Sequence, residues 1–235
     1  IEAAMMVQSG MTGVPDPLDG TPNFFTANNH QGDIAKAFGT LGRPFEIART
    51  NIKRWSVGSP AQAVMDALEA LIVKYKIRPQ DVDRADVFLS PRSAQVVDSR
   101  DMLDINVQYL SAIMILDGTL SFAASHDFTR GRDPKVVALR KKITLLPDPS
   151  LESVKLPRQG RATIYLKDGR VVRHHTKTVR GTAENPMSVA EVETKARDLI
   201  VPVLGAKNAA AIVRAVATLD RAKSVDKLVA LMQGK

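Results

Sequence analysis

The stretch 50–75, TNIKRWSVGSPAQAVMDALEALIVKY, decides the fold because it joins a short extended run to an amphipathic helix. Apolar side chains recur there at three- and four-residue spacing, which predicts one buried helix face: Val64, Met65, Leu68, Leu71, Ile72 and Tyr75. Pro60 suits the first helical position, since its missing N–H would have no partner within the helix. We expect Ser59 to cap this helix.

Two cations lie directly before this helix, Lys53 and Arg54. The free N–H groups around Gln62 should point back toward them, because the first turn of a helix has no carbonyl partners for its donors. Cations beside the positive end of a helix favour an anion, most simply a carboxylate. The alternative is that both side chains are ordinary solvated surface charges.

The residues after this helix predict an α+β unit with a sheet. Strands are expected at 83–89 and 143–146, and a hairpin is expected where Asp168-Gly169 separates the runs 161–167 and 170–178. Helices are expected at 104–116, which is apolar on all sides, at 120–124, and from Asp133-Pro134 onward.

Both ends of the chain read as helical. A helix is expected over 1–10, and further helices over 188–203, 206–218 and 224–233, the first of them opened by a capping box of Ser188 and Glu191. A Gly- and Pro-rich loop covers 11–31 and contains His30, and a short helix is expected at 33–38. The fold class is therefore α+β: part of an all-helical domain (1–55), an inserted α+β lid domain (56–180), and C-terminal helices that return to the helical domain (181–235).

Composition limits the classes of protein to consider. The 235 residues are 44% hydrophobic and contain no cysteine, which excludes disulfides and thiolate metal sites. No run approaching the ~20 apolar residues of a membrane span and no signal peptide is recognised, so a cytoplasmic protein without membrane contact is expected. The net charge of +8 raises nucleic-acid binding, yet the basic residues are dispersed and no aromatic residues interleave with them.

Three segments resemble the C-terminal half of the MmgE/PrpD family: NIKRWSVGSPAQAVMDALEAL, INVQYLSAIMILDG and RGTAENPMSVAEVETKARDL. That family includes 2-methylcitrate dehydratase, cis-aconitate decarboxylase and iminodisuccinate epimerase. The resemblance implies an all-helical domain with a smaller lid, an active site in the cleft between them, and a homodimer. It implies no cofactor and no metal, and the dehydratases work without an iron–sulfur cluster.

The resemblance also implies site residues. Lys53 matches the lysine placed at the substrate carboxylates, with Arg54 and Gln62 beside it, and Tyr109 matches an active-site tyrosine. A buried tyrosine is either a core residue with a satisfied hydroxyl or a donor facing a cleft. Many relatives carry Cys and His where this chain has Gly58 and Gln62, and the family's other acid–base residues precede Ile1. We therefore expect an N-terminal half that is missing from this chain.

The resulting hypothesis is a lyase or isomerase for small di- or tricarboxylic acids, most simply a 2-methylcitrate dehydratase-like hydro-lyase of propionate metabolism. Removing a proton next to a carboxylate builds charge on that group, and a fixed cation such as Lys53 would stabilise it. A non-catalytic or partner-dependent module of the same fold is the alternative, and a basic nucleic-acid binder is the third reading.

Overall fold

The computed structural model describes residues 1–28, 38–43, 45–153 and 158–234. The expectations for His30 and for residues 33–37 of the short helix lie outside the described residues. The chain divides into two compact units, Ile1–Arg49 and Thr50–Lys235, and each is considered by itself.

The first unit contains little regular structure. Helix α1 (Glu2–Gln8) confirms the helix expected at the start of the chain, α2 (Phe24–Ala27) is a single turn within the expected loop, and a 3-10 turn covers Glu46–Arg49. No residue of α1 is buried, and Met5, Met6 and Val7 are each at least half exposed. Among the described residues of this unit, none is buried against α1 to form a core.

A four-stranded mixed sheet forms the base of the second unit. Its strands are β1 (Val82–Leu89), β2 (Ile143–Pro147), β3 (Gly160–Leu166) and β4 (Val171–Thr176), in the spatial order β2-β1-β3-β4. Strands β1 and β2 are parallel, whereas β1 with β3 and β3 with β4 are antiparallel. The strands expected near 83–89 and 143–146 and the hairpin at Asp168-Gly169 are confirmed.

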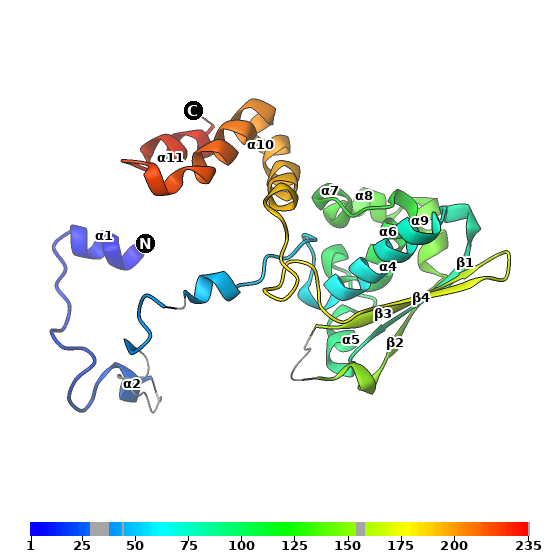
Figure 1. Cartoon of the computed structure of the whole chain (residues 1–235), viewed down its shortest axis with the longest axis horizontal. Coiled ribbons are helices and arrows are strands. Elements are labelled where there is room, and N and C mark those ends of the chain that lie inside the picture. The colour runs from blue at the N-terminus through cyan, green and yellow to red at the C-terminus, as the bar shows by residue number, and fades with distance from the viewer. Residues whose placement is uncertain (29–37, 44, 154–157, 235) are drawn as a thin grey trace. The chain divides into compact units, whose positions relative to one another are not determined.

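Helices α4 (Gln62–Tyr75) and α6 (Val107–Asp117) pack along one face of this sheet (Figure 1). The faces expected from the apolar spacing are buried, with Leu68 of α4, Ile113 of α6 and Ile164 of β3 each 0% exposed. Tyr75 at the end of α4 is the exception, since it is 37% exposed. The second unit also contains four short helices: α5 (Pro91–Val97), α7 (Phe122–His126), α8 (Phe128–Gly131) and α9 (Pro134–Arg140). The mixed helix and sheet content agrees with the α+β class.

Two local expectations were incomplete or wrong. Helices α5 and α8 were missed, because each is too short to display a helical period. Ser59 is not the N-cap of α4: it lies inside a 3-10 turn, Ser59–Ala61, that leads into the helix, and no side chain caps α4. The turn begins after Gly58, whose N–H donates to the Asp104 carbonyl at 2.9 Å.

The C-terminal helices are α10 (Val189–Ala217) and α11 (Asp226–Met232). The expected capping box is confirmed, since Ser188 and Glu191 bond reciprocally. Helix α10 is long and apolar enough to cross a membrane by length and composition, which corrects the expectation that no such stretch exists. It carries Pro202 and leaves helical geometry at Gly205, so its two pieces, 189–204 and 206–217, are each shorter than the ~20 residues of a span.

Candidate functional site

The loop 52–57, which carries Lys53, is fixed by side chains of α4. Gln62 accepts a hydrogen bond from the Trp55 N–H at 3.1 Å and donates to the carbonyls of Trp55 and Val57 at 2.9 and 3.2 Å. One helical turn later, Asp66 accepts the indole N–H of Trp55 at 2.9 Å. Residues four apart share one face of a helix, so α4 presents both groups to the loop.

The C-terminal segment fixes the same loop from its other side. The Ile52 N–H donates to the Gly181 carbonyl at 2.7 Å, and the Arg180 N–H donates to the second oxygen of Asp66 at 2.8 Å. Burial raises the pKa of Asp66, and its hydrogen bonds to Arg180 and Trp55 oppose that shift. The loop is thus held by groups that lie far apart in the sequence.

Lys53 is exposed, and its ammonium donates to the Val57 carbonyl at 3.0 Å. A second ammonium reaches the same loop, because Lys195 of α10 donates to the Lys53 main-chain carbonyl. Burial, followed by the charge of Lys53, lowers the pKa of Lys195. An anion bound near both lysines would offset the repulsion between their charges and would stabilise their charged forms.

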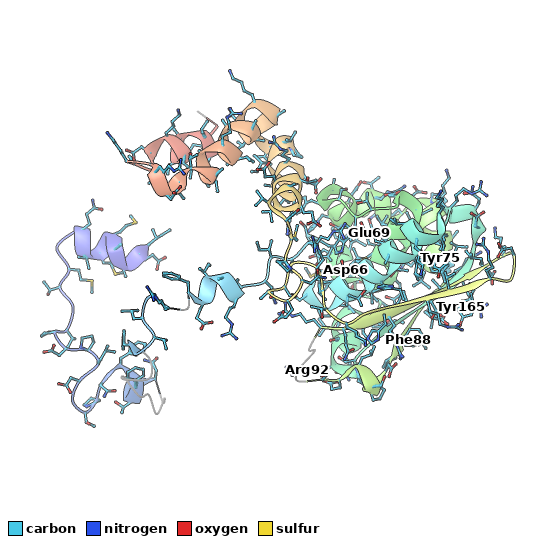
Figure 2. All side chains as sticks on the ribbon, viewed as in Figure 1. Asp66, Glu69, Tyr75, Phe88, Arg92 and Tyr165 are labelled. Atoms are coloured by element: carbon cyan, nitrogen blue, oxygen red, sulfur yellow. The ribbon has the colours of Figure 1, made fainter. Side chains whose placement is uncertain are left out.

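Arg54 is not the free cation that was expected. Its guanidinium forms a two-point ion pair with Glu69 of α4, at 2.5 and 2.6 Å, and lies 4.4 Å from the centre of the Trp55 ring. Figure 2 shows Asp66 and Glu69 close together on this helix. Arg54 therefore braces the loop, and Lys195 is the cation that accompanies Lys53.

A pocket of about 450 Å³ lies beside the loop, between the α+β body and α10. Arg54, Trp55 and Ser56 form one wall and 119–121 another, while the face of α10 supplies Glu191, Thr194, Lys195 and Asp198. Glu191 is paired with Arg180 and Asp198 accepts the Phe122 N–H, so both carboxylates are engaged. Lys53 does not line this pocket, but its carbonyl contacts Lys195, which does.

Gln62 and Tyr109 are not placed as ligands. Gln62 is 2% exposed, and both N–H bonds of its amide are used by the loop. Tyr109 is 0% exposed and its hydroxyl donates to the Ala124 carbonyl. In this structure the phenol faces a main-chain carbonyl and not a cleft, which agrees with the alternative of a core tyrosine whose hydroxyl is satisfied; a catalytic role for Tyr109 stays a prediction.

No cluster of three or more His, Asp or Glu side chains able to hold a metal ion occurs among the described residues. Arg54 is paired with Glu69, and the Gln62 amide is used by the loop. The donors that remain beside the loop are the ammonium groups of Lys53 and Lys195. This donor set suits an anionic organic ligand.

A sequence model of the MmgE/PrpD C-terminal domain matches residues 55–221. This chain belongs to the MmgE/PrpD family. A search of curated proteins gave no significant match. The matched range contains Gln62, Tyr109 and Lys195. It begins two residues after Lys53. The predicted role of Lys53 at the substrate carboxylate therefore rests on the loop geometry and on the resemblance of the wider segment.

The family consists of lyase- or isomerase-type enzymes. Sequence analysis of this member missed Lys195, because a single lysine on a long helix carries no local signal. The capping box at Ser188 and Glu191 gave the only indirect indication. It fixes where α10 begins and hence which side chains face the loop.

Replacing Tyr109 with phenylalanine tests its role as a core residue. Burial raises the pKa of Tyr109 to about 12. The neutral phenol therefore stabilises the fold fully below the ordinary tyrosine pKa of ~10. This stabilisation is lost as the pH rises from ~10 to about 12. We expect the variant to lose ~1 kcal/mol of unfolding free energy at pH 8 and to approach wild type as pH rises through this window. Chemical denaturation across pH measures this. A 100-fold or larger loss of turnover with unchanged stability would contradict the core assignment.

Proposed function

We propose that this MmgE/PrpD protein is a lyase or isomerase that removes a proton next to a carboxylate of a small di- or tricarboxylic acid. The most economical assignment is a 2-methylcitrate dehydratase-like hydro-lyase, active in propionate metabolism in the cytoplasm. The observation that carries the proposal is the contact of the Lys195 ammonium, on α10, with the main chain of Lys53, beside a pocket of small-molecule size that Lys195 lines. Family membership supports the reaction class.

In this mechanism the two cations bind and polarise one carboxylate of the substrate. As a base removes the neighbouring carbon-bound proton, negative charge grows on that carboxylate, and an ammonium already in place stabilises it without reorganisation. Loss of hydroxide then completes dehydration. Loss of CO₂ or reprotonation on the opposite face would give a decarboxylase or an epimerase from the same intermediate.

The base is assigned to an N-terminal half that packs against the helices of this chain. Among the described residues, the helices outside the α+β body expose much apolar surface: Val189 is 75%, Val203 77% and Met232 61% exposed, and α10 buries only Ala209 and Ile212. Apolar surface of this kind is typical of a protein interface. We propose that the remainder of the helical domain covers it and that the complete protein is a homodimer.

The second candidate is a non-catalytic or partner-dependent module of the same fold. Gln62 favours it, since an amide engaged with the loop cannot act as a general base where many relatives have histidine. A binding module would take up the carboxylate through Lys53 and Lys195 and release it unchanged.

Proton exchange in heavy water separates the two candidates. The protein that contains this chain together with its N-terminal half is incubated with citrate-, 2-methylcitrate- and aconitate-type acids, and deuterium at the carbon next to each carboxylate is followed by NMR. The enzyme is expected to introduce deuterium into one acid of the panel and to form the dehydrated product. Saturable binding of an acid without any exchange would reject the enzymatic proposal and leave the binding module.

A further inference from the structure

A second pocket, of about 580 Å³, lies where the parallel strands β1 and β2 end. Ser90, Arg92 and Ser93 follow β1 directly, Glu152 follows β2 after a short turn, and Arg158 precedes β3. In open sheets, the loops that leave the carboxyl ends of parallel strands are the common place for a ligand. In Figure 2, Arg92 lies well apart from Asp66 and Glu69, which hold the Lys53 loop.

Two arginines face this pocket without a carboxylate partner. Neither Arg92 nor Arg158 forms an ion pair within the described part of the chain, although Glu152 lines the same pocket. Elsewhere guanidinium groups close to an acid are paired, as Arg54 is with Glu69 and Arg161 with Asp148. Arg92, in the first turn of α5, and Arg158, before β3, are both exposed and therefore keep their donors available.

Hydroxyl groups complete the donor set. Ser90 is 7% exposed and donates to the Ser93 hydroxyl at 3.1 Å, so the hydrogen of Ser93 remains for another acceptor. Ser59 adds a third hydroxyl from the turn before α4. The side chain of Gln159 already has partners, since its amide nitrogen donates to the Leu151 carbonyl and its oxygen is hydrogen-bonded to the ring of His175. The carboxylate of Glu152 also lines the pocket, and the other available groups are donors: the guanidiniums of Arg92 and Arg158 and the hydroxyls of Ser59 and Ser93.

We propose that this pocket binds a phosphate group. A phosphate dianion has acceptor oxygens that point in several directions, and it forms two-point contacts with planar guanidinium donors. It therefore matches two arginines and several serine hydroxyls better than a single carboxylate would. The volume lies within the ~300–1,000 Å³ of small-molecule sites, so a phosphate monoester fits as well as inorganic phosphate. The site is distinct from the carboxylate site at Lys53.

NMR titration tests the proposal on the same full protein, with inorganic phosphate, glycerol 3-phosphate and AMP as probes and the amides of Ser90, Arg92 and Ser93 as reporters. Saturable shifts are expected at millimolar phosphate, and Arg92→Gln and Arg158→Gln should each weaken binding about tenfold, the loss of one charge-assisted contact. Tighter binding of a monoester identifies an organic phosphate as the ligand, and equal binding identifies the free ion.

Two controls keep this test independent of the proposed function. Arg132→Gln removes an exposed arginine outside the pocket and should leave phosphate binding unchanged, as should Lys53→Met at the carboxylate site. Phosphate binding that survives the Arg92/Arg158 double substitution, or that is lost with Lys53→Met alone, would overturn the proposal. The absence of saturable shifts in the wild-type protein up to ~50 mM phosphate, far above a millimolar Kd, would overturn it as well.

Discussion

Replacing Lys53 with methionine is expected to lower turnover about 10²–10³-fold, the usual effect of removing one fixed donor from a developing anion. The fold should be almost unaffected, because the Lys53 side chain is exposed and its ammonium donates to the Val57 carbonyl, which also accepts from Gln62. Unfolding free energy is therefore expected to stay within ~0.5 kcal/mol of wild type. Steady-state kinetics and chemical denaturation of one preparation measure both quantities.

Lys141→Met is the matched control. Lys141 is an exposed lysine that follows α9, outside the loop and its pocket, so the same loss of charge should leave turnover unchanged. A comparison of kcat with kcat/KM then shows where Lys53 acts. Equal losses in both indicate a contact made in the transition state, whereas a rise in KM alone indicates ground-state binding. Wild-type kinetics in Lys53→Met would end the assignment of Lys53 to the substrate carboxylate.

The elements that the sequence predicted well are those in which an apolar pattern repeats over many residues or a specific turn sequence occurs. Helix α4, the buried helix α6 and the hairpin at Asp168-Gly169 follow from residue spacing alone, because burial on one face repeats over several turns or strand residues. The same reasoning failed for the ends and for short pieces. The 3-10 turn at Ser59–Ala61 depends on the contact of Gly58 with Asp104, which no local pattern encodes.

The candidate site was predictable only in part, since its contacts join residues more than a hundred positions apart. Lys53 stands out locally, but its neighbour Lys195 and the main-chain bond from Arg180 to Asp66 arise from the way α10 returns to the α+β body. Arg54 shows the opposite case. Its charge is obvious in the sequence, but its carboxylate partner is not. Glu69, on α4, forms an ion pair with Arg54 and so occupies the guanidinium.

The close approach of two segments at Gly181 gives the largest expected effect on stability. Gly181 has φ +95°, and a Cβ placed on it would overlap the carbonyl oxygen of Ile52. The same pair of residues forms the bond from the Ile52 N–H to the Gly181 carbonyl. Gly181→Ala is expected to separate the two segments and to lower the unfolding free energy by ~3 kcal/mol or more, since backbone strain and lost contacts add.

Gly169→Ala isolates the contribution of backbone strain. Gly169 lies in the β3–β4 turn with φ +88°, and no atom is within 4 Å of the position that its Cβ would take. This control should therefore lose only the ~1 kcal/mol typical of a left-handed alanine and keep its turnover. Urea denaturation gives the two losses of stability. Because Ile52 precedes Lys53, Gly181→Ala should also reduce turnover as the loop moves away from Lys195. Equal destabilisation of both variants, with turnover retained, would show that the Ile52–Gly181 contact does not position the Lys53 loop.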